Sequence, residues 1–312
     1  MLADLLTRVM RPIDPPLVFE SAAEWWEDHV DATADLERPI DRAICGATRV
    51  DRLGFAFAGG YAAALRALVP DLPERTLASF AATEEGGAHP RAIHTTLTTD
   101  GVDGWLLDGS KQWVTLGPEG GAILVVARLA GHADDPRPTL RVVRVDARAP
   151  GVTVTPLPHM PFVPEIPHAS LRLERVEVAP ADVLLGDGYE HYLKPFRTIE
   201  DLHVHASTPA WLLAVGARAD WPHAPRERAL AALVTARSLA MLSPSSPVVH
   251  LALGGLIAEA RAIIDELEPC WASVDPALRA RWERDKPLLG VAGKARAQRL
   301  LRAWDRLEGE RG

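Results

Sequence analysis

The chain has 312 residues, 47% of them hydrophobic, which is enough for a buried core and for two or three structural units. Its formal net charge of −8 makes nucleic acid an unfavourable partner, because an acidic surface repels phosphate backbones. Cys45 and Cys270 lie far apart and outside any metal or CxxC spacing, as in a reduced cytoplasmic protein. Asp4 and Arg8 interrupt the apolar N-terminus, and apolar stretches such as 122–127 are too short to span a bilayer. We therefore expect a soluble cytoplasmic protein without a membrane partner.

The first 78 residues show the three- and four-residue spacing of apolar side chains that is typical of helices. Ser21-Ala-Ala-Glu24 resembles a capping box and predicts a helix that continues through Val30. A second helical run is expected from about Pro39 to Leu68, and Gly59-Gly60 marks the point where it could break. Pro70 ends the helical pattern.

From residue 77 the pattern changes to short segments rich in β-branched residues. Strands are expected at 94–99, 105–108, 112–115, 122–127, 139–145 and 171–178. Because no helices separate them, they indicate an antiparallel sheet or barrel. No Gly-x-Gly-x-x-Gly or Walker loop supports a Rossmann or P-loop site. The proline-rich stretch 155–169 is expected to be a stiff loop that cannot join a central sheet.

Helical spacing returns after residue 182. Helices are expected at about 189–219, 226–242, 248–267 and 276–308. The order of elements divides the chain into an N-terminal helical domain (1–78), a middle β-domain (79–182) and a C-terminal helical domain (183–312), which is an α+β organisation.

Two motifs in the strand-rich segment resemble those of the acyl-CoA dehydrogenase family. Ser79-Phe-Ala-Ala-Thr83-Glu84-Glu85-Gly86-Gly87 is similar to the family's aromatic, two small residues, Thr-Glu-Pro and Gly-rich turn. Asp108-Gly-Ser-Lys111-Gln112-Trp113-Val114-Thr115 is similar to its Asn-Gly-x-Lys-x-Trp-Ile-Thr. Pro150-Gly-Val152 and 176–186 follow in family order. The resemblance covers roughly residues 40 to 308. It implies an acyl-CoA dehydrogenase-like fold with an N-terminal helical domain, a middle antiparallel β-domain and a C-terminal helical bundle.

The resemblance also implies FAD as the cofactor. It places Trp113 against the flavin ring and Thr115 near N5, with Phe80 and Thr83 on the pyrimidine side. On a regular strand, Trp113 and Thr115 are two residues apart and share one face, which suits a common ligand. The alternative is that Trp113 is a core aromatic residue and that the threonines are ordinary strand residues.

The chain departs from the family pattern in the turn after Glu84 and at its C-terminal end. The family's serine that helps hold the pantetheine arm is missing from the turn. His89 and Arg91 could instead meet a phosphate or carboxylate of the substrate, or could lie in a solvated loop. At the other end, the loop that carries the family's usual glutamate base and the last helix are absent, so we expect a truncated C-terminal domain.

Some family members place the catalytic base on the first helix after the β-domain. Counting about twelve residues from Gly188 reaches Glu200, which we name as the candidate base. The alternative for Glu200 is an exposed or salt-bridged residue beside Arg197. His203 and His205 point to different faces of a helix, so no metal is expected there.

The favoured function is an FAD-dependent oxidoreductase that dehydrogenates the α,β bond of an acyl thioester or related acyl compound. Its partners would be an electron-transferring flavoprotein and, as a homodimer or hetero-oligomer, a second copy or a related subunit. One alternative is a non-catalytic or accessory subunit with partial or no flavin binding, and a distant one is a metal-dependent hydrolase. Three tryptophans offer apolar area either for assembly or for internal packing: Trp271, Trp282 and Trp304.

Overall fold

The computed structural model describes residues 2–101, 104–131 and 138–309. Residues 310–312 lie outside the described residues, and the truncated C-terminal domain stays a prediction. The chain forms two compact units. The helical unit consists of Met1–Ala67, Met160–Glu165 and Arg197–Gly312, and the β unit consists of Leu68–His159 and Ile166–Phe196. The domain boundaries expected at 78/79 and 182/183 stay predictions.

The N-terminal part of the helical unit contains four helices: α1 (Leu2–Met10), α2 (Ala22–Ala32), α3 (Pro39–Ala47) and α4 (Leu53–Leu68). The Ser21 side chain caps α2 by accepting a hydrogen bond from the Glu24 amide, at 3.1 Å, which confirms the predicted helix start. The predicted break at Gly59-Gly60 is wrong, because the chain turns between Ala47 and Leu53 instead.

Both glycines lie buried inside α4, where they allow close helix packing. A Cβ atom added at Gly60 would come within 2.8 Å of the Val204 Cα atom. Such a distance is too short for any residue larger than glycine unless the backbone of α5 moves. The glycine pair therefore marks a helix contact rather than a helix end.

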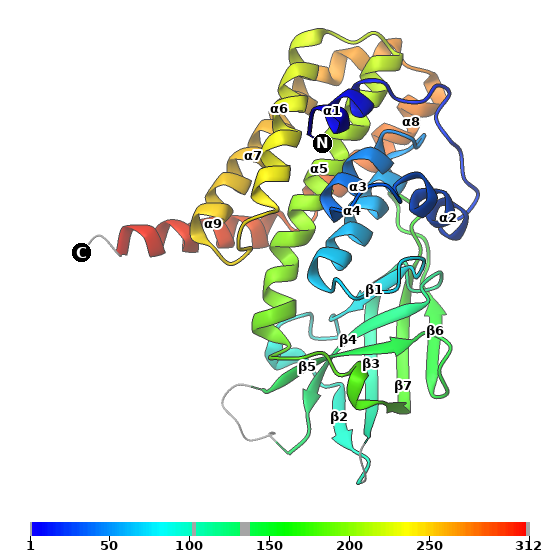
Figure 1. Ribbon diagram of the computed structural model, residues 1–312, viewed down its shortest axis with the longest axis vertical. Coiled ribbons are helices and arrows are strands. Elements are labelled where there is room, and N and C mark those ends of the chain that lie inside the picture. Colours follow the sequence, from blue (N-terminus) through cyan, green and yellow to red (C-terminus); the bar gives the residue numbers. More distant parts are fainter. Residues whose placement is uncertain (1, 102–103, 132–137, 310–312) are drawn as a thin grey trace. The chain divides into compact units, whose positions relative to one another are not determined.

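The C-terminal part of the chain continues with further helical elements (Figure 1). They are η3 (Tyr189–Leu193), α5 (Lys194–Arg218), α6 (His223–Leu239), α7 (Pro247–Leu267), η4 (Glu268–Ser273), α8 (Pro276–Asp285), η5 (Lys286–Gly290) and α9 (Gly293–Gly309). The single helix expected at 276–308 is wrong. Pro287 lacks the amide hydrogen that a continuing helix needs, and Gly290 follows it, so α8 and α9 are separate.

Four tryptophans pack together in the helical unit: Trp211, Trp221, Trp271 and Trp282. The rings of Trp271 and Trp282 are stacked, with centroids 4.8 Å apart and planes 7° from parallel. Both side chains are buried, so they serve internal packing rather than assembly. Trp304 on α9 is exposed.

The segment Pro247–Ser273, which joins α7 to η4, is long and apolar enough to cross a membrane when length and composition are the only criteria. The expectation that every apolar stretch is too short is therefore wrong for this segment. A third of its most apolar window is buried within the protein. Core helices pass the same test, and Leu253, Leu256 and Ile263 of α7 are core residues.

The described residues of the β unit form a seven-stranded sheet: β1 (Ala78–Ala81), β2 (Thr96–Thr99), β3 (Trp105–Thr115), β4 (Ala122–Leu129), β5 (Leu140–Asp146), β6 (Val152–Pro156) and β7 (His168–Val178). The strand order is β1-β4-β2-β3-β7-β6, with β5 paired to β4. β4 pairs in parallel with β1 and β2, and the other pairs are antiparallel. The strands predicted at 105–108 and 112–115 are one strand, β3, the other four predicted strands are confirmed, and β1 and β6 are additional. The expectation that 155–169 is a loop outside the sheet is wrong at both ends, because 155–156 end β6 and 168–169 begin β7, which pairs with both β3 and β6. Pro156 ends β6, an edge strand, where a missing amide hydrogen is tolerated.

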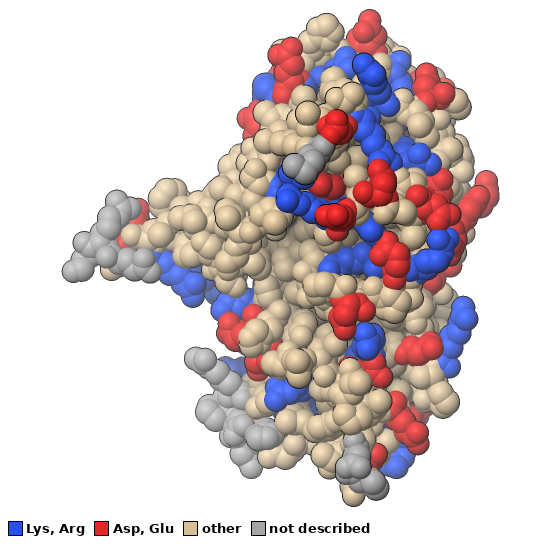
Figure 2. Space-filling model, in the orientation of Figure 1, with Lys and Arg blue, Asp and Glu red and all other residues tan. Residues whose placement is uncertain are grey.

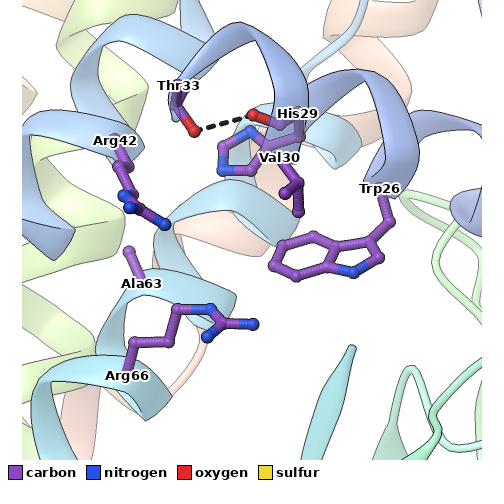
Figure 3. Close-up of a pocket in the computed structure, with 7 residues that line it drawn as sticks. All are labelled: Trp26, His29, Val30, Thr33, Arg42, Ala63 and Arg66. Atoms are coloured by element: carbon purple, nitrogen blue, oxygen red, sulfur yellow. Dashed lines mark hydrogen bonds between the residues drawn. The ribbon is translucent and has the colours of Figure 1, made fainter. Parts of the chain in front are cut away.

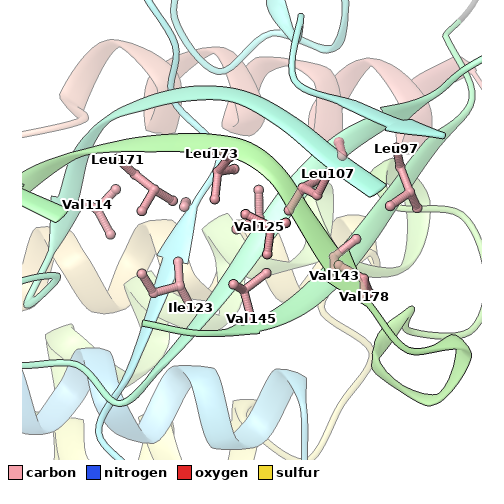
Figure 4. Close-up of a cluster of buried hydrophobic side chains, with 13 residues drawn as sticks. Leu97, Leu107, Val114, Ile123, Val125, Val143, Val145, Leu171, Leu173 and Val178 are labelled. Carbon is pink, nitrogen blue, oxygen red and sulfur yellow. The ribbon is translucent and has the colours of Figure 1, made fainter. Parts of the chain in front are cut away.

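Apolar side chains from six of these strands form one core (Figure 4). The core consists of Ala81, Leu97, Leu107, Val114, Ile123, Val125, Ala127, Val143, Val145, Leu171, Leu173, Val176 and Val178. Along β7 these side chains alternate with more exposed residues except at 174–175, whereas along β4 the intervening residues are buried as well. Basic and acidic side chains are interspersed on the face shown in Figure 2.

Candidate functional site

The predicted flavin-contacting strand, β3, contains a β-bulge. Lys111 pairs with Leu171 of β7 and Val114 pairs with Ala169, so β3 has one extra residue between these pairs. Trp113 lies in this bulge with a φ of 58°, and Leu116 beyond it has a φ of 60°. Left-handed backbone is unfavourable for residues other than glycine, and such strain gathers at functional sites. The Trp113 side chain is 54% exposed.

The bulge adjoins the other predicted flavin-contacting segment. The Gln112 amide donates a hydrogen bond to the Thr83 carbonyl oxygen, at 2.8 Å. Phe80 on β1 is buried, and its ring contacts that of Phe196 with centroids 4.6 Å apart. The two motifs identified in the sequence thus lie next to each other. Trp113 and Thr115 were expected to share one face because side chains alternate along a regular strand. The bulge interrupts that alternation.

A buried ion pair connects the same two segments. The Lys111 Nζ atom donates to the Glu84 Oε1 atom at 2.6 Å, and both side chains are almost completely buried. Glu84 also accepts hydrogen bonds from the His94 amide (2.8 Å), the Thr95 amide (3.1 Å) and the Thr95 hydroxyl (2.8 Å). Sequence reasoning assigned no role to this pair, because the 27-residue separation hides the contact.

The two charges offset much of the cost of burial. Burial lowers the pKa of Lys111 to about 8, against the opposing effect of Glu84. Burial acts to raise the pKa of Glu84, but Lys111 and the backbone hydrogen bonds outweigh it and hold that pKa below its usual range. Glu84 is therefore a carboxylate, and its charge helps to keep Lys111 protonated near neutral pH.

The candidate substrate-binding residues, His89 and Arg91, lie in an exposed turn that begins at Glu84. Glu84 and Gly87 exchange two backbone hydrogen bonds, and Gly87 has a φ of 96°, which glycine tolerates. The Arg91 amide donates to the His89 Nδ1 atom at 3.2 Å. This hydrogen bond joins the Arg91 backbone to the His89 side chain, and the role of the two residues in substrate binding stays a prediction.

Glu200, the candidate base, lies on α5 in the helical unit. It is half-buried. Burial raises its pKa to about 7, and the neighbouring Asp201 carboxylate acts in the same direction, against Arg296 and Arg197. Asp201 itself is held by Arg296 at 2.8 Å and by Arg299. A carboxyl group that titrates near neutral pH suits proton abstraction.

His203 and His205 are both buried on α5. The His203 Nδ1 atom donates to the Ile199 carbonyl oxygen at 2.7 Å, and burial lowers the pKa of each imidazole to about 4. The His205 Nε2 atom has no hydrogen-bond partner among the described residues. Nowhere in the described residues do three His, Cys, Asp or Glu side chains come close enough together to hold a metal ion.

A small cavity lies in the helical unit (Figure 3). Its lining residues are Trp26, His29, Val30, Thr33, Arg42, Ala63 and Arg66. The cavity has a volume of about 10 Å³, room for about one water molecule. None of the predicted site residues is among those that line it, so it adds nothing to the flavin hypothesis.

Part of the β unit is similar to a known protein family. Residues 79–176 match the acyl-CoA dehydrogenase middle domain. No curated protein has a sequence significantly similar to that of this chain.

Solved structures resemble the chain over almost its whole length. A probable acyl CoA dehydrogenase from Mycobacterium abscessus is 16% identical, with 96% of each chain covered and a TM-score of 0.67. The electron transferring flavoprotein of Acidaminococcus fermentans is 15% identical, with 97% of each chain covered and a TM-score of 0.70. KijD3, in complex with FMN and a dTDP-linked sugar, is 18% identical, with 93% of this chain and 87% of KijD3 covered and a TM-score of 0.63. At these identities the likeness shows the fold alone.

Proposed function

Because the chain has the acyl-CoA dehydrogenase fold and residues 79–176 match that family's middle domain, we propose that it is an FAD-dependent oxidoreductase. The proposed reaction is α,β-dehydrogenation of an acyl thioester or a related acyl compound. The observation that carries the proposal is the bulge in β3, where a strained and exposed Trp113 adjoins Thr83. An indole that no core packing requires is available for a flat ligand.

The residues at the bulge fit a flavin. Trp113 offers an exposed aromatic surface, and the half-buried Thr83 and Thr115 have hydroxyl groups that can donate or accept hydrogen bonds. Phe80 supplies an apolar side chain at the facing segment. FAD, when bound, supplies the hydride-accepting chemistry. These four residues would hold it, and the Glu84–Lys111 pair would keep their two segments together.

The chain's own acid–base chemistry would come from Glu200. As a carboxylate it would take the proton from the α-carbon of the acyl compound, and a pKa of about 7 lets it accept and release that proton near neutral pH. His89 and Arg91 would bind a phosphate or carboxylate group of the substrate. Burial of the carboxyl group disfavours its charge and so makes it a stronger base.

We also propose the partners that such a reaction needs. An electron-transferring flavoprotein would accept the electrons that the proposed dehydrogenation releases. The active form would be a homodimer or a hetero-oligomer with a related subunit, in the cytoplasm.

The visible spectrum of the purified protein tests the flavin. Bound oxidised flavin absorbs at roughly 370 and 450 nm, and identification of the extracted compound distinguishes FAD from the FMN found with KijD3. A colourless protein that binds neither added FAD nor added FMN would overturn the proposal and favour an accessory subunit.

Anaerobic bleaching of the flavin by a panel of acyl-CoA compounds tests the reaction. Glu200→Gln should abolish bleaching and leave the flavin spectrum intact. The exposed Glu190, ten residues earlier, provides the matched control, because Glu190→Gln should bleach at the wild-type rate. Unchanged bleaching in Glu200→Gln would remove Glu200 from the role of base.

A further inference from the structure

His168, at the start of β7, lies beside the two β3 residues of the proposed flavin site. Its Cα atom pairs with that of Thr115 across the antiparallel ladder. Its imidazole contacts the Trp113 indole edge to face, with centroids 6.5 Å apart and planes at 70°. Sequence reasoning passed over His168, because it stands in the proline-rich stretch and the contact depends on the register between β3 and β7.

The His168 ring is held in one orientation. Its Nδ1 atom lies 3.1 Å from the Ile166 carbonyl oxygen, and since a carbonyl only accepts, Nδ1 carries the hydrogen. The backbone is held as well, because the Leu157 amide donates to the His168 carbonyl oxygen at 2.8 Å. Burial lowers the pKa of His168, so the imidazole is neutral at pH 7.

Trp113 needs such a neighbour. Its backbone is in the left-handed region, and about half of its side chain is exposed, so core packing leaves much of the indole unsupported. Edge-to-face contacts between aromatic rings contribute both attraction and a preferred angle. A fixed imidazole beside the indole therefore restricts the directions that the indole can take.

We propose that His168 is a positioning residue of the flavin site, which holds the Trp113 indole in the orientation that receives the flavin ring. This inference rests on the proposed function. His168 acts through its ring contact with Trp113, and the hydrogen bond to Ile166 sets the plane of the imidazole.

Titration of flavin-free protein with FAD tests the effect on binding. An edge-to-face pair of this kind corresponds to roughly a 2- to 12-fold change in Kd, so His168→Ala should weaken FAD binding by about that factor. His168→Phe keeps a ring edge and should restore most of the affinity. His159→Ala, at an exposed histidine of the same unit, should bind like wild type. Equal affinity in wild type and His168→Ala would overturn the inference, as would a Phe variant no better than the Ala variant.

The emission of Trp113 gives a second readout, which needs no flavin. The contribution of Trp113 to the fluorescence is obtained by subtracting the emission spectrum of the Trp113→Phe variant from that of the otherwise identical protein with Trp113. In the His168→Ala background this contribution should shift to longer wavelength, because the indole becomes more hydrated. An unchanged contribution would overturn the inference even if the fold is intact. If wild type binds no flavin, the proposed function fails, whereas a shifted emission would still establish the contact of His168 with Trp113.

Discussion

The ion pair between Glu84 and Lys111 is a residue-scale feature with a measurable energy. Replacing Lys111 with Met leaves the Glu84 carboxylate buried without its partner, which should lower the free energy of unfolding by about 3–5 kcal/mol. The double variant Glu84→Gln, Lys111→Met removes both charges. Its loss in free energy of unfolding should be clearly smaller than the sum of the losses of the two single variants. Urea unfolding of the four proteins measures this, and additive losses would contradict it.

Glu200 should make stability depend on pH. Its pKa rises from 4.5 to about 7 on folding, so between these values the folded chain holds a proton that the unfolded chain has released. The free energy of unfolding should therefore fall as pH rises from about 4.5 to 7. Because Glu200 is only half-buried, we expect the loss to be about 1–2 kcal/mol.

Glu200→Gln removes the titration and serves as the reference. Chemical unfolding at several pH values should show wild type losing stability relative to this variant across the window. Parallel curves for the two proteins would contradict the raised pKa.

Residue-scale prediction from sequence succeeds where a motif is local. Thr83 and Trp113 were found because each stands in a short segment with several matching neighbours. His168 and the Glu84–Lys111 pair could not be found, because their contacts depend on strand register and on partners 27 or more residues away. The left-handed backbone of Trp113 was also hidden, since a bulge is set by the pairing of two strands.

At the scale of elements, Gly60 separates packing from helix propensity. Alanine favours a helix over glycine by about 1 kcal/mol, but at Gly60 its Cβ atom would press on the α5 backbone. Overpacking of this kind costs about 1–3 kcal/mol, so Gly60→Ala should be destabilising on balance. Gly255 on α7 has open space around it, so Gly255→Ala should stabilise the protein by about 0.5–1 kcal/mol. Thermal unfolding compares the two, and shifts of the same sign would contradict the packing argument.

The helix boundaries show which local signals are decisive. Proline gave the correct place for the end of α4, while the glycine pair inside it gave a false break. Pro287 and Gly290, by contrast, do separate α8 from α9, although the apolar spacing continues through them. Glycine marks either a helix end or a close contact, and only the position of the neighbouring helix decides between the two.

At the scale of the whole molecule, the order of helices, strands and helices follows from the change in periodicity along the chain. Residues 160–165 belong to the helical unit, and periodicity does not predict this, because the grouping depends on long-range contacts. The Val163 amide donates to the Asp285 carboxylate at 2.7 Å, across 122 residues. No local pattern in a proline-rich loop indicates such a partner.

Flavin binding should stabilise the folded chain as a whole. A ligand that binds only the folded state raises the free energy of unfolding by about 2.7 kcal/mol at 100 times its Kd. The Tm should therefore rise with FAD concentration, and the rise at a given concentration should shrink in Trp113→Ala. Trp304→Ala removes a tryptophan that is 46% exposed on α9, and it should keep the full rise. If the FAD-dependent rise in Tm were reduced equally in both variants, the reduction would come from general destabilisation rather than from loss of a flavin held at the bulge. A wild-type Tm that does not respond to FAD would mean that the strained Trp113 serves some purpose other than binding a flavin.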